Sequence, residues 1–465
     1  MKLLSIVIYF LLIFIFFIRS SNKPKTSIDF ILGNKNLNSV TTALSILSAE
    51  MSGWLIMVLP GVVFLNGVSE IWHPIGLICG SYLNWQFVAK KIRLATHSHN
   101  KVTTIPNYLS NKLNDPTGLI KITATIIATI FFIIYISSSL SALSLLINTF
   151  INTQYSYCLL MSGLVIIFYT GIGGFTAITH IDVLQSFVVL FVLFIVPSIA
   201  IISSYTNIID FYFYIGVSSI NIRDPLLNIN IINLISLLSW GLGYFGQPHI
   251  LVRFIAIKNY TFLNLSKKIY ITWMILSFIA VFYVGFVGRL LFCTTNIVNS
   301  ETILLLLLDK VSSQFFSGIA LASILSVVIS SAAAQLHSTT SCLTEDIISS
   351  FFKKVNKILC MRIMMLLIII ISMILSSNPN NTILSLVSLA WAGFGSSFGP
   401  VILFSLYSNI TISSVFYGMI TGSVTVVIWY LLKTSDGIFS LYEIVPGFMI
   451  SSFVIFILNN LFHKK

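Results

Sequence analysis

The feature that most constrains this chain is the repetition of long apolar segments from one end to the other. Of its 465 residues, 57% are hydrophobic and only 8% are charged, whereas a soluble globular protein carries about 25% charged residues. Most segments approach or exceed the roughly 20 residues that a helix needs to cross a bilayer. We count about thirteen such segments, at residues 2–19, 37–66, 71–89, 120–147, 156–171, 184–204, 228–248, 269–292, 313–340, 360–376, 383–407, 411–432 and 444–462.

This pattern predicts an all-α polytopic membrane protein with about 13 transmembrane helices. Backbone groups find no water partner in lipid, so helices are the only spanning form that the pattern allows. No polar stretch is long enough to bury a core of its own, so we expect no soluble domain. Because the number of spans is odd, the termini are expected on opposite sides of the membrane.

The positive charges predict the orientation. With the N-terminus outside and the C-terminus inside, twenty of the 25 Lys and Arg residues fall on the inner side, Arg253 among them. This asymmetry is the positive-inside rule. The net charge of +12 is therefore a topology signal, and it argues against a nucleic-acid partner. The five outer residues are Lys2, Arg223, Arg289, Lys310 and Lys433.

One acidic residue, Glu50, lies in the middle of the apolar stretch "SILSAEMSGWLIM". An ionised acid at the bilayer centre costs about 2.5–3.5 kcal/mol on insertion scales, so such a residue is a functional hypothesis by default. The other acids, such as Asp182, Glu70 and Glu345, are expected in loops or at span ends. We predict that Glu50 compensates a cation. Sodium is a hard ion that takes oxygen ligands from carboxylates, hydroxyls and unwound backbone carbonyls.

Two predicted spans contain helix breakers. One has Ser52-Gly53 and Pro60-Gly61, and the other contains "WGLGYFGQP" at 240–248. Gly and Pro weaken a helix interior, and in a membrane loosened backbone survives only where it lines a cavity or is buried in protein. The alternative is an ordinary kink, because membrane helices tolerate Gly and Pro.

The two broken spans are five spans apart and therefore cross the membrane in opposite directions. Broken helices at matching places in two inverted halves indicate the central site of a transporter. We therefore predict a five-plus-five inverted-repeat core. Its parts are a first helix with a cytoplasmic linker (1–36), a first repeat (37–204), a second repeat (205–407), and two C-terminal helices with a short cytoplasmic tail (408–465).

Other polar residues have weaker signals. Ser330 and Ser331 offer two adjacent hydroxyls on a helix of small residues, although Ser also commonly serves helix packing. The five cysteines have no metal or redox spacing and are expected as free thiols. We find no GxSxG, HExxH or phosphate-loop motif and predict that the protein is not an enzyme. The lone histidines are expected to be structural: His73, His180, His249 and His337.

From about Phe30 to about Phe448 the sequence resembles the sodium/solute symporter family. The matching stretches are "VTTALSILSAEMSGWLIMVLPGVVFLNGVSEIW" from Val40, "GGFTAITHIDVLQ" from Gly173, "WGLGYFGQPHILVRF" from Trp240, "LTEDI" from Leu343 and "AWAGFGSSFGPVILFS" from Ala390. Within the family, the branch that transports proline fits better than the pantothenate or sugar branches.

The resemblance implies sodium-coupled import of L-proline by alternating access across a bacterial inner membrane. Sodium would be the co-transported ion, and no organic cofactor is implied. The alternatives are uptake of another small carboxylated solute, such as a different amino acid or a pantothenate-like compound, and an impaired symporter. A sodium channel would need a continuous polar lining, whereas here the acid and hydroxyl positions cluster at one depth.

The resemblance also implies site residues. The family has aspartate where this chain has Glu50, and a ligand misplaced by about 1 Å commonly works poorly, so ion affinity is left open. Trp240 and Tyr244 are one helical turn apart and could bracket the proline ring, with the ammonium group on an aromatic face; the alternative for Trp240 is the interfacial aromatic belt. The sodium residues would be Glu50, Ser48, Met51, Ser52, Val327, Ser330 and Ser331, and the substrate residues Gly53, Tyr135, Trp240, Tyr244 and Pro248.

Overall fold

The structure is a computed structural model of the chain, and it describes residues 1–20, 26–96, 102–204, 230–292, 299–311, 313–352, 354–378, 382–434 and 437–462. Parts of three predicted features lie outside these residues. They are the linker after the first helix (21–25), the long loop expected on the outer side (205–229) and the C-terminal tail (463–465).

Within the described residues every element is helical, apart from one isolated bridge between Leu37 and Ile257. The helices are α1 (Lys2–Ser20), α2 (Ser27–Leu32), α3 (Ser39–Glu50), α4 (Leu59–Asn66), α5 (Trp72–Asn84), α6 (Lys90–Ala95), α7 (Ile105–Lys112), α8 (Leu119–Ile151), α9 (Tyr155–Ser204), α11 (Ile231–Ser239), α12 (Pro248–Ala256), α13 (Leu263–Phe292), α14 (Ile303–Asp309), α15 (Gln314–Cys342), α16 (Ser349–Phe351), α17 (Lys357–Ser376), α18 (Ile383–Tyr407), α19 (Ile412–Leu431) and α20 (Ile444–Phe462).

Short 3-10 or π-helical turns join several of these helices. They are η1 (Gly33–Lys35), η2 (Trp54–Val58), η3 (Gly67–Ile71), η4 (Trp85–Ala89), η5 (Trp240–Gly246), η6 (Tyr260–Phe262), η7 (Ser300–Thr302), η8 (Leu343–Ile348) and η9 (Ile438–Ser440). In the described part of the chain, nine helical stretches are long and apolar enough to cross a membrane. The all-α membrane fold is therefore confirmed, while the count of thirteen spans and the inverted repeat stay predictions.

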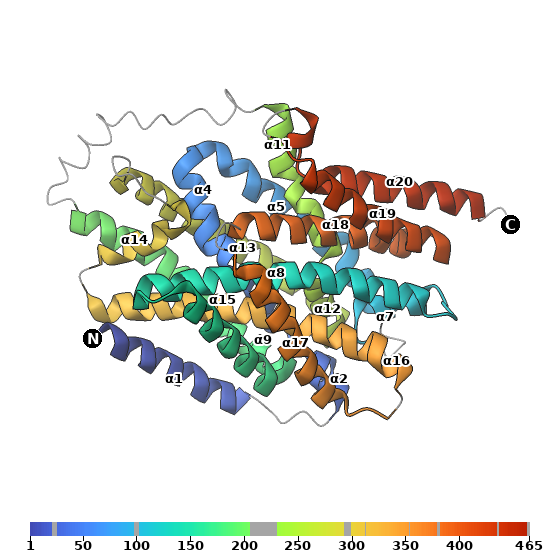
Figure 1. The fold of residues 1–465 in the computed structure, drawn as a ribbon, viewed down its shortest axis with the longest axis horizontal. Helices are drawn as coiled ribbons and strands as arrows, with labels where there is room; N and C mark the ends of the chain where they lie inside the picture. The colour runs from blue at the N-terminus through green and yellow to red at the C-terminus, as the bar shows by residue number, and fades with distance from the viewer. Residues whose placement is uncertain are drawn as a thin grey trace.

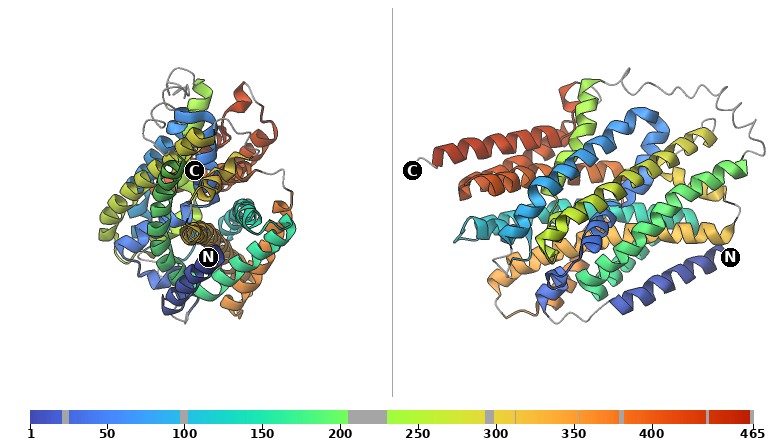
Figure 2. Two further views of the ribbon diagram at one scale, coloured as in Figure 1. Left: turned by 90° about the vertical axis from the view of Figure 1, so that its left-hand side faces the viewer. Right: turned by 180° about the vertical axis from the view of Figure 1, so that it is seen from behind.

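The helices form one elongated bundle (Figures 1 and 2). Helix α1 begins at one end of the long axis, near α14, and α20 ends at the other, where α7 and α16 lie (Figure 1). We call these the α14 end and the α7 end. Termini at opposite ends are what an odd number of crossings requires. Which end faces the outside stays a prediction.

Burial separates central helices from peripheral ones. The most apolar windows of α15 and α18 are 83% and 89% buried inside the protein, whereas that of α20 is 22% buried. Helix α15 can be central because its middle is built of Ala and Ser, and small side chains let helix backbones approach closely. Helices α19 and α20 lie side by side on α18 (Figure 1). The core that carries the site is therefore walled by α8, α15 and α18.

Helix α9 contains a sharp turn that joins two predicted spans. At Gly174 the backbone has φ 59° and ψ −174°, which interrupts the helical conformation. A side chain there would be strained by the positive φ, and a Cβ atom would lie 3.0 Å from the ring of Phe30. Glycine is therefore required at this turn. The turn at Gly174 falls between the predicted segments 156–171 and 184–204.

Candidate functional site

The first predicted helix break is present next to Glu50. Helix α3 ends at this residue, and Met51 follows with φ −71° and ψ 60°, outside the helical region. The N–H of Ser52 turns back to the carbonyl of Glu50 at 2.7 Å, and the chain resumes as the π-helical turn η2. The expected second interruption at Pro60-Gly61 does not occur. Pro60 stands where the π-helical turn η2 continues directly into α4, and such local π-helical adjustment compensates the backbone groups that a proline leaves unpaired in a membrane helix.

The second predicted break lies between α11 and α12. Residues Trp240–Gly246 form a 3-10 turn, Gln247 is extended, and Pro248 starts α12. The indole N–H of Trp391 on α18 donates to the carbonyl of Trp240 at 2.8 Å. Gly243 lies against that indole so closely that a Cβ atom would overlap it. The indole of Trp391 on α18 thus supplies a hydrogen-bond donor to the backbone of the broken segment.

The carboxylate of Glu50 is buried between the two breaks. The residue is 4% exposed, and its Oε2 accepts hydrogen bonds from the hydroxyls of Tyr244 at 3.2 Å and of Tyr270 at 2.5 Å. Its Oε1 has no partner among the described residues. No Lys, Arg or His of the described residues forms a salt bridge with Glu50. Its charge is therefore met by hydroxyl groups and not by a fixed cation.

Further unpaired oxygens lie in the same core. The hydroxyls of Ser48, Ser52 and Tyr135 are buried and have no hydrogen-bond partner within the described part of the chain. A Cβ atom at Gly53 would overlap the Cβ of Ala142 on α8, so glycine lets the broken segment pack directly on α8. Unpaired buried oxygens are costly unless something binds them, and a cation coordinates such groups.

A second buried charge cluster involves two residues that were expected near the ends of apolar segments. Asp182, expected in a loop or at a span end, is fully buried within α9, and Arg253, counted among the basic residues of the inner loops, is 2% exposed within α12. Their side chains form an ion pair of 3.4 Å. Arg253 also donates to the carbonyl of His249 at 2.7 Å. Sequence reasoning missed this pair because its members are far apart along the chain.

The paired hydroxyls of α15 are divided between different partners. Ser330 donates a hydrogen bond to the carboxylate of Asp182, whereas Ser331 donates to the carbonyl of Val328 at 3.0 Å. Both serines and Val327 are fully buried. The structure thus brings Ser330 to an acid, and the acid is Asp182 and not Glu50.

Four aromatic side chains pack together around Trp240. The ring of Trp240 lies 4.5 Å from that of His73, 4.8 Å from that of Tyr442 and 5.8 Å from that of Trp54, measured between centroids. We call these four residues the aromatic layer. Tyr244 lies one turn further and meets the indole of Trp391 edge-on at 5.2 Å. Trp240 therefore belongs to the aromatic layer, whereas Tyr244 contacts the carboxylate of Glu50.

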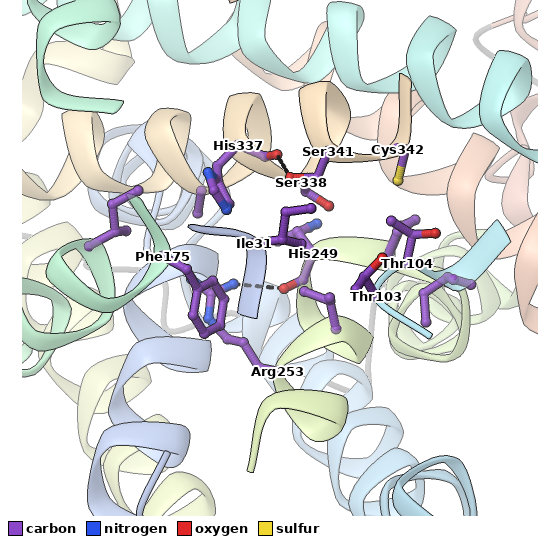
Figure 3. A pocket seen from close by; sticks show the side chains of 15 residues that line it. Ile31, Thr103, Thr104, Phe175, His249, Arg253, His337, Ser338, Ser341 and Cys342 are labelled. Atoms are coloured by element: carbon purple, nitrogen blue, oxygen red, sulfur yellow. Dashed lines mark hydrogen bonds between the residues drawn. The ribbon is translucent and has the colours of Figure 1, made fainter. Parts of the chain in front are cut away.

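The four residues of the aromatic layer line a cavity of about 290 Å³. Next to Pro248 lies a cavity of about 20 Å³ (Figure 3), which is room for one water molecule. His249 and Arg253 from α12 and His337 from α15 point into this region (Figure 3). The second broken segment thus borders the larger cavity at Trp240 and the smaller one at Pro248.

Comparisons with known proteins identify the family of the chain. Residues 30–422 match the model of the sodium:solute symporter family. The chain belongs to this family. Its members couple the movement of a solute to that of sodium, so the protein is a sodium-coupled transporter and not an enzyme in the catalytic sense. Sodium is the co-transported ion. The membrane-helix pattern and the bacterial relatives support a multi-pass protein of the inner membrane.

The chain is similar to several curated proteins and solved structures. It is 37% identical to the sodium/proline symporter of Escherichia coli K12 over 91% of this chain and 86% of that protein. It is 33% identical to sodium/proline symporter 2 of Staphylococcus saprophyticus over 96% of this chain and 90% of that protein.

Two solved structures have the same fold at lower sequence identity. A sodium-coupled sialic acid symporter in its substrate-bound outward-open state matches with a TM-score of 0.79 at 17% identity, covering 99% of this chain and 98% of that one. A transporter of the nucleobase-cation-symport-1 family matches with a TM-score of 0.57 at 12% identity, covering 93% and 94%.

Proposed function

We propose that the protein imports L-proline together with sodium by alternating access. The identities of 37% and 33% to sodium/proline symporters support proline as the solute. The observation that carries the proposal is the buried carboxylate of Glu50, held at a helix break by two tyrosine hydroxyls and free of any salt bridge among the described residues. A buried charge without a fixed counter-ion favours binding of a mobile cation.

In this proposal sodium binds beside the first break. Its predicted ligands are the carboxylate of Glu50, the hydroxyl of Ser52 and carbonyls near Ser48 and Met51. Val327, Ser330 and Ser331 on α15 would contribute oxygens from the facing helix. The carboxylate is one methylene longer than the aspartate of the family pattern, and it reaches Tyr270 on α13 at 2.5 Å. The longer side chain of Glu50 therefore places its carboxylate against the hydroxyl of Tyr270, and this hydrogen bond holds the charge in one position.

Proline would bind at the second break. Gly53 and Tyr135 would face it from the first repeat, and Trp240, Tyr244 and Pro248 from the second. Tyr244 donates to Glu50 at 3.2 Å, so one side chain touches both the ion site and the substrate site. Shared contacts of this kind make binding of each ligand depend on the other, and such coupling is reciprocal.

Alternating access requires that the two ends of the bundle open in turn. At the α7 end, Thr104 donates to the buried carboxylate of Asp346 at 2.7 Å, and Lys357 pairs with Glu345 at 2.6 Å. These contacts support closure of that end. Sodium entering from the α14 end would order the broken segments before the bundle rocks to release both ligands.

Uptake of labelled L-proline into proteoliposomes tests the proposal. An inward sodium gradient should drive accumulation, and the same gradient of potassium should not. Unlabelled amino acids and a pantothenate-like acid added in excess test the rival solutes. Failure of proline to compete, with successful competition by another carboxylated solute, would assign the site to that solute. No accumulation of any tested solute would match the impaired symporter.

A further inference from the structure

Three basic residues from separate parts of the chain lie together near the end of α12. They are Lys35 in η1, Arg93 in α6 and Lys258, which follows shortly after α12 ends. Helix α12 packs against both η1 and α6, and the guanidinium group of Arg93 donates to the backbone carbonyl of Lys258 at 3.1 Å. We call these three residues the cationic cluster. Because α12 also packs against α7, the cluster lies on the α7 side of the bundle (Figure 1).

The isolated bridge between Leu37 and Ile257 fixes the backbone of the cluster. The N–H of Leu37 donates to the carbonyl of Ala256 at 3.1 Å, and the N–H of Lys258 donates to the carbonyl of Leu37 at 2.9 Å. The bridge thus ties the segment before α3 to the segment after α12. Helix α3 ends at Glu50 and α12 follows the second break, so the cluster stands at the ends of these two helices that lie away from the breaks.

The charges of the cationic cluster lack an acidic partner within the described part of the chain. No salt bridge there involves Lys35, Arg93 or Lys258. Arg93 is 5% exposed and its Nε has no hydrogen-bond partner among these residues, and the same holds for the buried ammonium nitrogen of Lys35. Burial, together with the positive charge of Arg93, lowers the pKa of Lys35. Buried cations without a partner are costly, so the cluster favours binding of an anion.

The surroundings of the cluster favour an anion that carries apolar chains. Exposed apolar side chains stand beside it: Leu94 is 46% exposed, Tyr260 is 43% exposed and Leu265 is 54% exposed. A further cation, the ammonium group of Lys90, lies 5.8 Å from the centre of the Tyr260 ring. A guanidinium group matches the oxygens of a phosphate with parallel N–H donors, and basic pockets between membrane helices bind anionic lipid head groups.

We propose that the cationic cluster binds the phosphate group of an anionic phospholipid from the leaflet at the α7 end. The ammonium group of Lys35 and the Nε–H of Arg93 would bind the phosphate oxygens, and Lys258 would approach them from the exposed side. The acyl chains would follow the outward faces of α6 and α13. A lipid bound in this way would link the segment before α3 to the segment after α12, and it would hold the two broken helices together at the α7 end.

Thermal unfolding of the full chain in detergent with added lipid tests the proposal. Dioleoyl phosphatidylglycerol should raise the unfolding midpoint of wild type more than dioleoyl phosphatidylcholine does. Lys35→Gln should weaken the apparent affinity for phosphatidylglycerol by on the order of tenfold to a hundredfold, the effect of losing a hydrogen bond to a charged group. Lys35→Arg keeps the charge and should retain the response. Lys112→Gln removes an exposed lysine of α7, and as the matched control it should respond as wild type.

The midpoint without added lipid separates a binding role of Lys35 from a structural one. Lys35→Gln removes a positive charge that is repelled by Arg93, so its lipid-free midpoint should equal or exceed that of wild type. A lower midpoint would show that the lysine is stabilised by the protein itself, and it would overturn the proposal. Arg93→Gln should lose the response to phosphatidylglycerol in the same way as Lys35→Gln.

The other outcomes are equally decisive. Equal responses of wild type to the two lipids, or a full response of Lys35→Gln, would overturn the site. A response that Lys112→Gln weakens as much as Lys35→Gln does would reduce it to general attraction between a basic surface and an anionic lipid. Inorganic phosphate that raises the midpoint as far as phosphatidylglycerol would assign the cluster to a free anion and overturn the lipid. None of these measurements uses proline or sodium, so their result is independent of the proposed function.

Discussion

The replacement of Glu50 with Gln removes one negative charge while keeping the shape of the side chain. The hydroxyls of Tyr244 and Tyr270, at 3.2 and 2.5 Å from the carboxylate, can still donate to the amide oxygen. We therefore expect the variant to fold. The residue has no salt bridge among those that the structure describes, so no cation is left unpaired by the change. What the variant loses is the attraction for an incoming ion.

The size of that loss follows from electrostatics. A monovalent cation about 4 Å from a carboxylate, at an effective dielectric constant of about 20, is attracted by about 4 kcal/mol. Each 1.4 kcal/mol is a factor of about ten in affinity, so Glu50→Gln should weaken sodium binding by nearly a thousandfold. Sodium titrations of proline binding measure this directly, and sodium-driven uptake should fall to the background of protein-free vesicles.

An acid at the surface provides the control for Glu50→Gln. Asp309 on α14 is 72% exposed and lies 4.0 Å from Lys2, and such surface pairs contribute at most about 1 kcal/mol. Asp309→Asn should leave the sodium titration as in wild type. A titration of Glu50→Gln that also matched wild type would refute the assignment of this carboxylate to the ion site.

Three further changes test other parts of the molecule. Ser330→Ala removes the hydroxyl that donates to buried Asp182, so thermal unfolding in detergent should reveal a loss of about 1–3 kcal/mol; an unchanged midpoint would contradict this. Gly243→Ala places a methyl group into the indole of Trp391, so proline binding should be lost, whereas Gly171→Ala, with open space around it, should bind normally. Asp115, in the loop before α8, has its pKa below the ordinary value: partial burial acts to raise it, but hydrogen bonds from Thr117, Ile120 and Gly118 outweigh that effect. A lowered folded-state pKa contributes stability above the unfolded value, and this contribution is lost as the pH falls through the folded value. Asp115→Ala should therefore destabilise the protein by about 1 kcal/mol at neutral pH. The difference in stability from wild type should shrink below about pH 4. A difference that stays constant with pH would show that the charge of the Asp115 carboxylate is not its source.

The helix breaks could be predicted from the sequence because their causes are local. Glycine and proline act on the backbone of their own turn, and the structure has breaks after Glu50 and at Trp240–Gly246. The expectation for Pro60-Gly61 was wrong for a reason that is also local. The π-helical turn η2 continues directly into α4 at Pro60, and a local π-helical adjustment compensates the backbone groups that a proline leaves unpaired.

The cluster around Asp182 could not be predicted in the same way. Arg253 is 71 residues away along the chain, and the fold alone brings the two side chains together. A local pattern places each charge near the end of an apolar segment, which is typical of loops. The one available signal is that a lone acid and a lone base each stand in a stretch with few other charges. That signal suggests a pair but does not identify its members.

The partners of Glu50 illustrate the same limit. Tyr244 was predicted as a substrate residue because of its place in the broken segment, and its hydroxyl in fact meets the carboxylate. Tyr270 had no distinguishing signal, since it is one of 18 tyrosines and lies in the regular helix α13. The roles of the individual sodium and substrate residues stay predictions, as do the orientation of the termini and the inverted repeat.

Two of the buried acids, Glu50 and Asp182, differ in what compensates their charge, and this difference explains how the ion can be both bound and released. Asp182 has a permanent partner in Arg253 at 3.4 Å, so it does not need an ion. Among the described residues, Glu50 has only hydroxyl donors, which stabilise a carboxylate but do not neutralise it. One charge crossing 100 mV releases about 2.3 kcal/mol, and a tenfold sodium gradient adds about 1.4 kcal/mol. Their sum sustains roughly a 500-fold solute gradient, provided that the ion leaves again on the inner side. A salt bridge to Glu50 would exclude the ion, and a second unpaired acid beside it would trap the ion, so a single uncompensated carboxylate suits repeated binding and release.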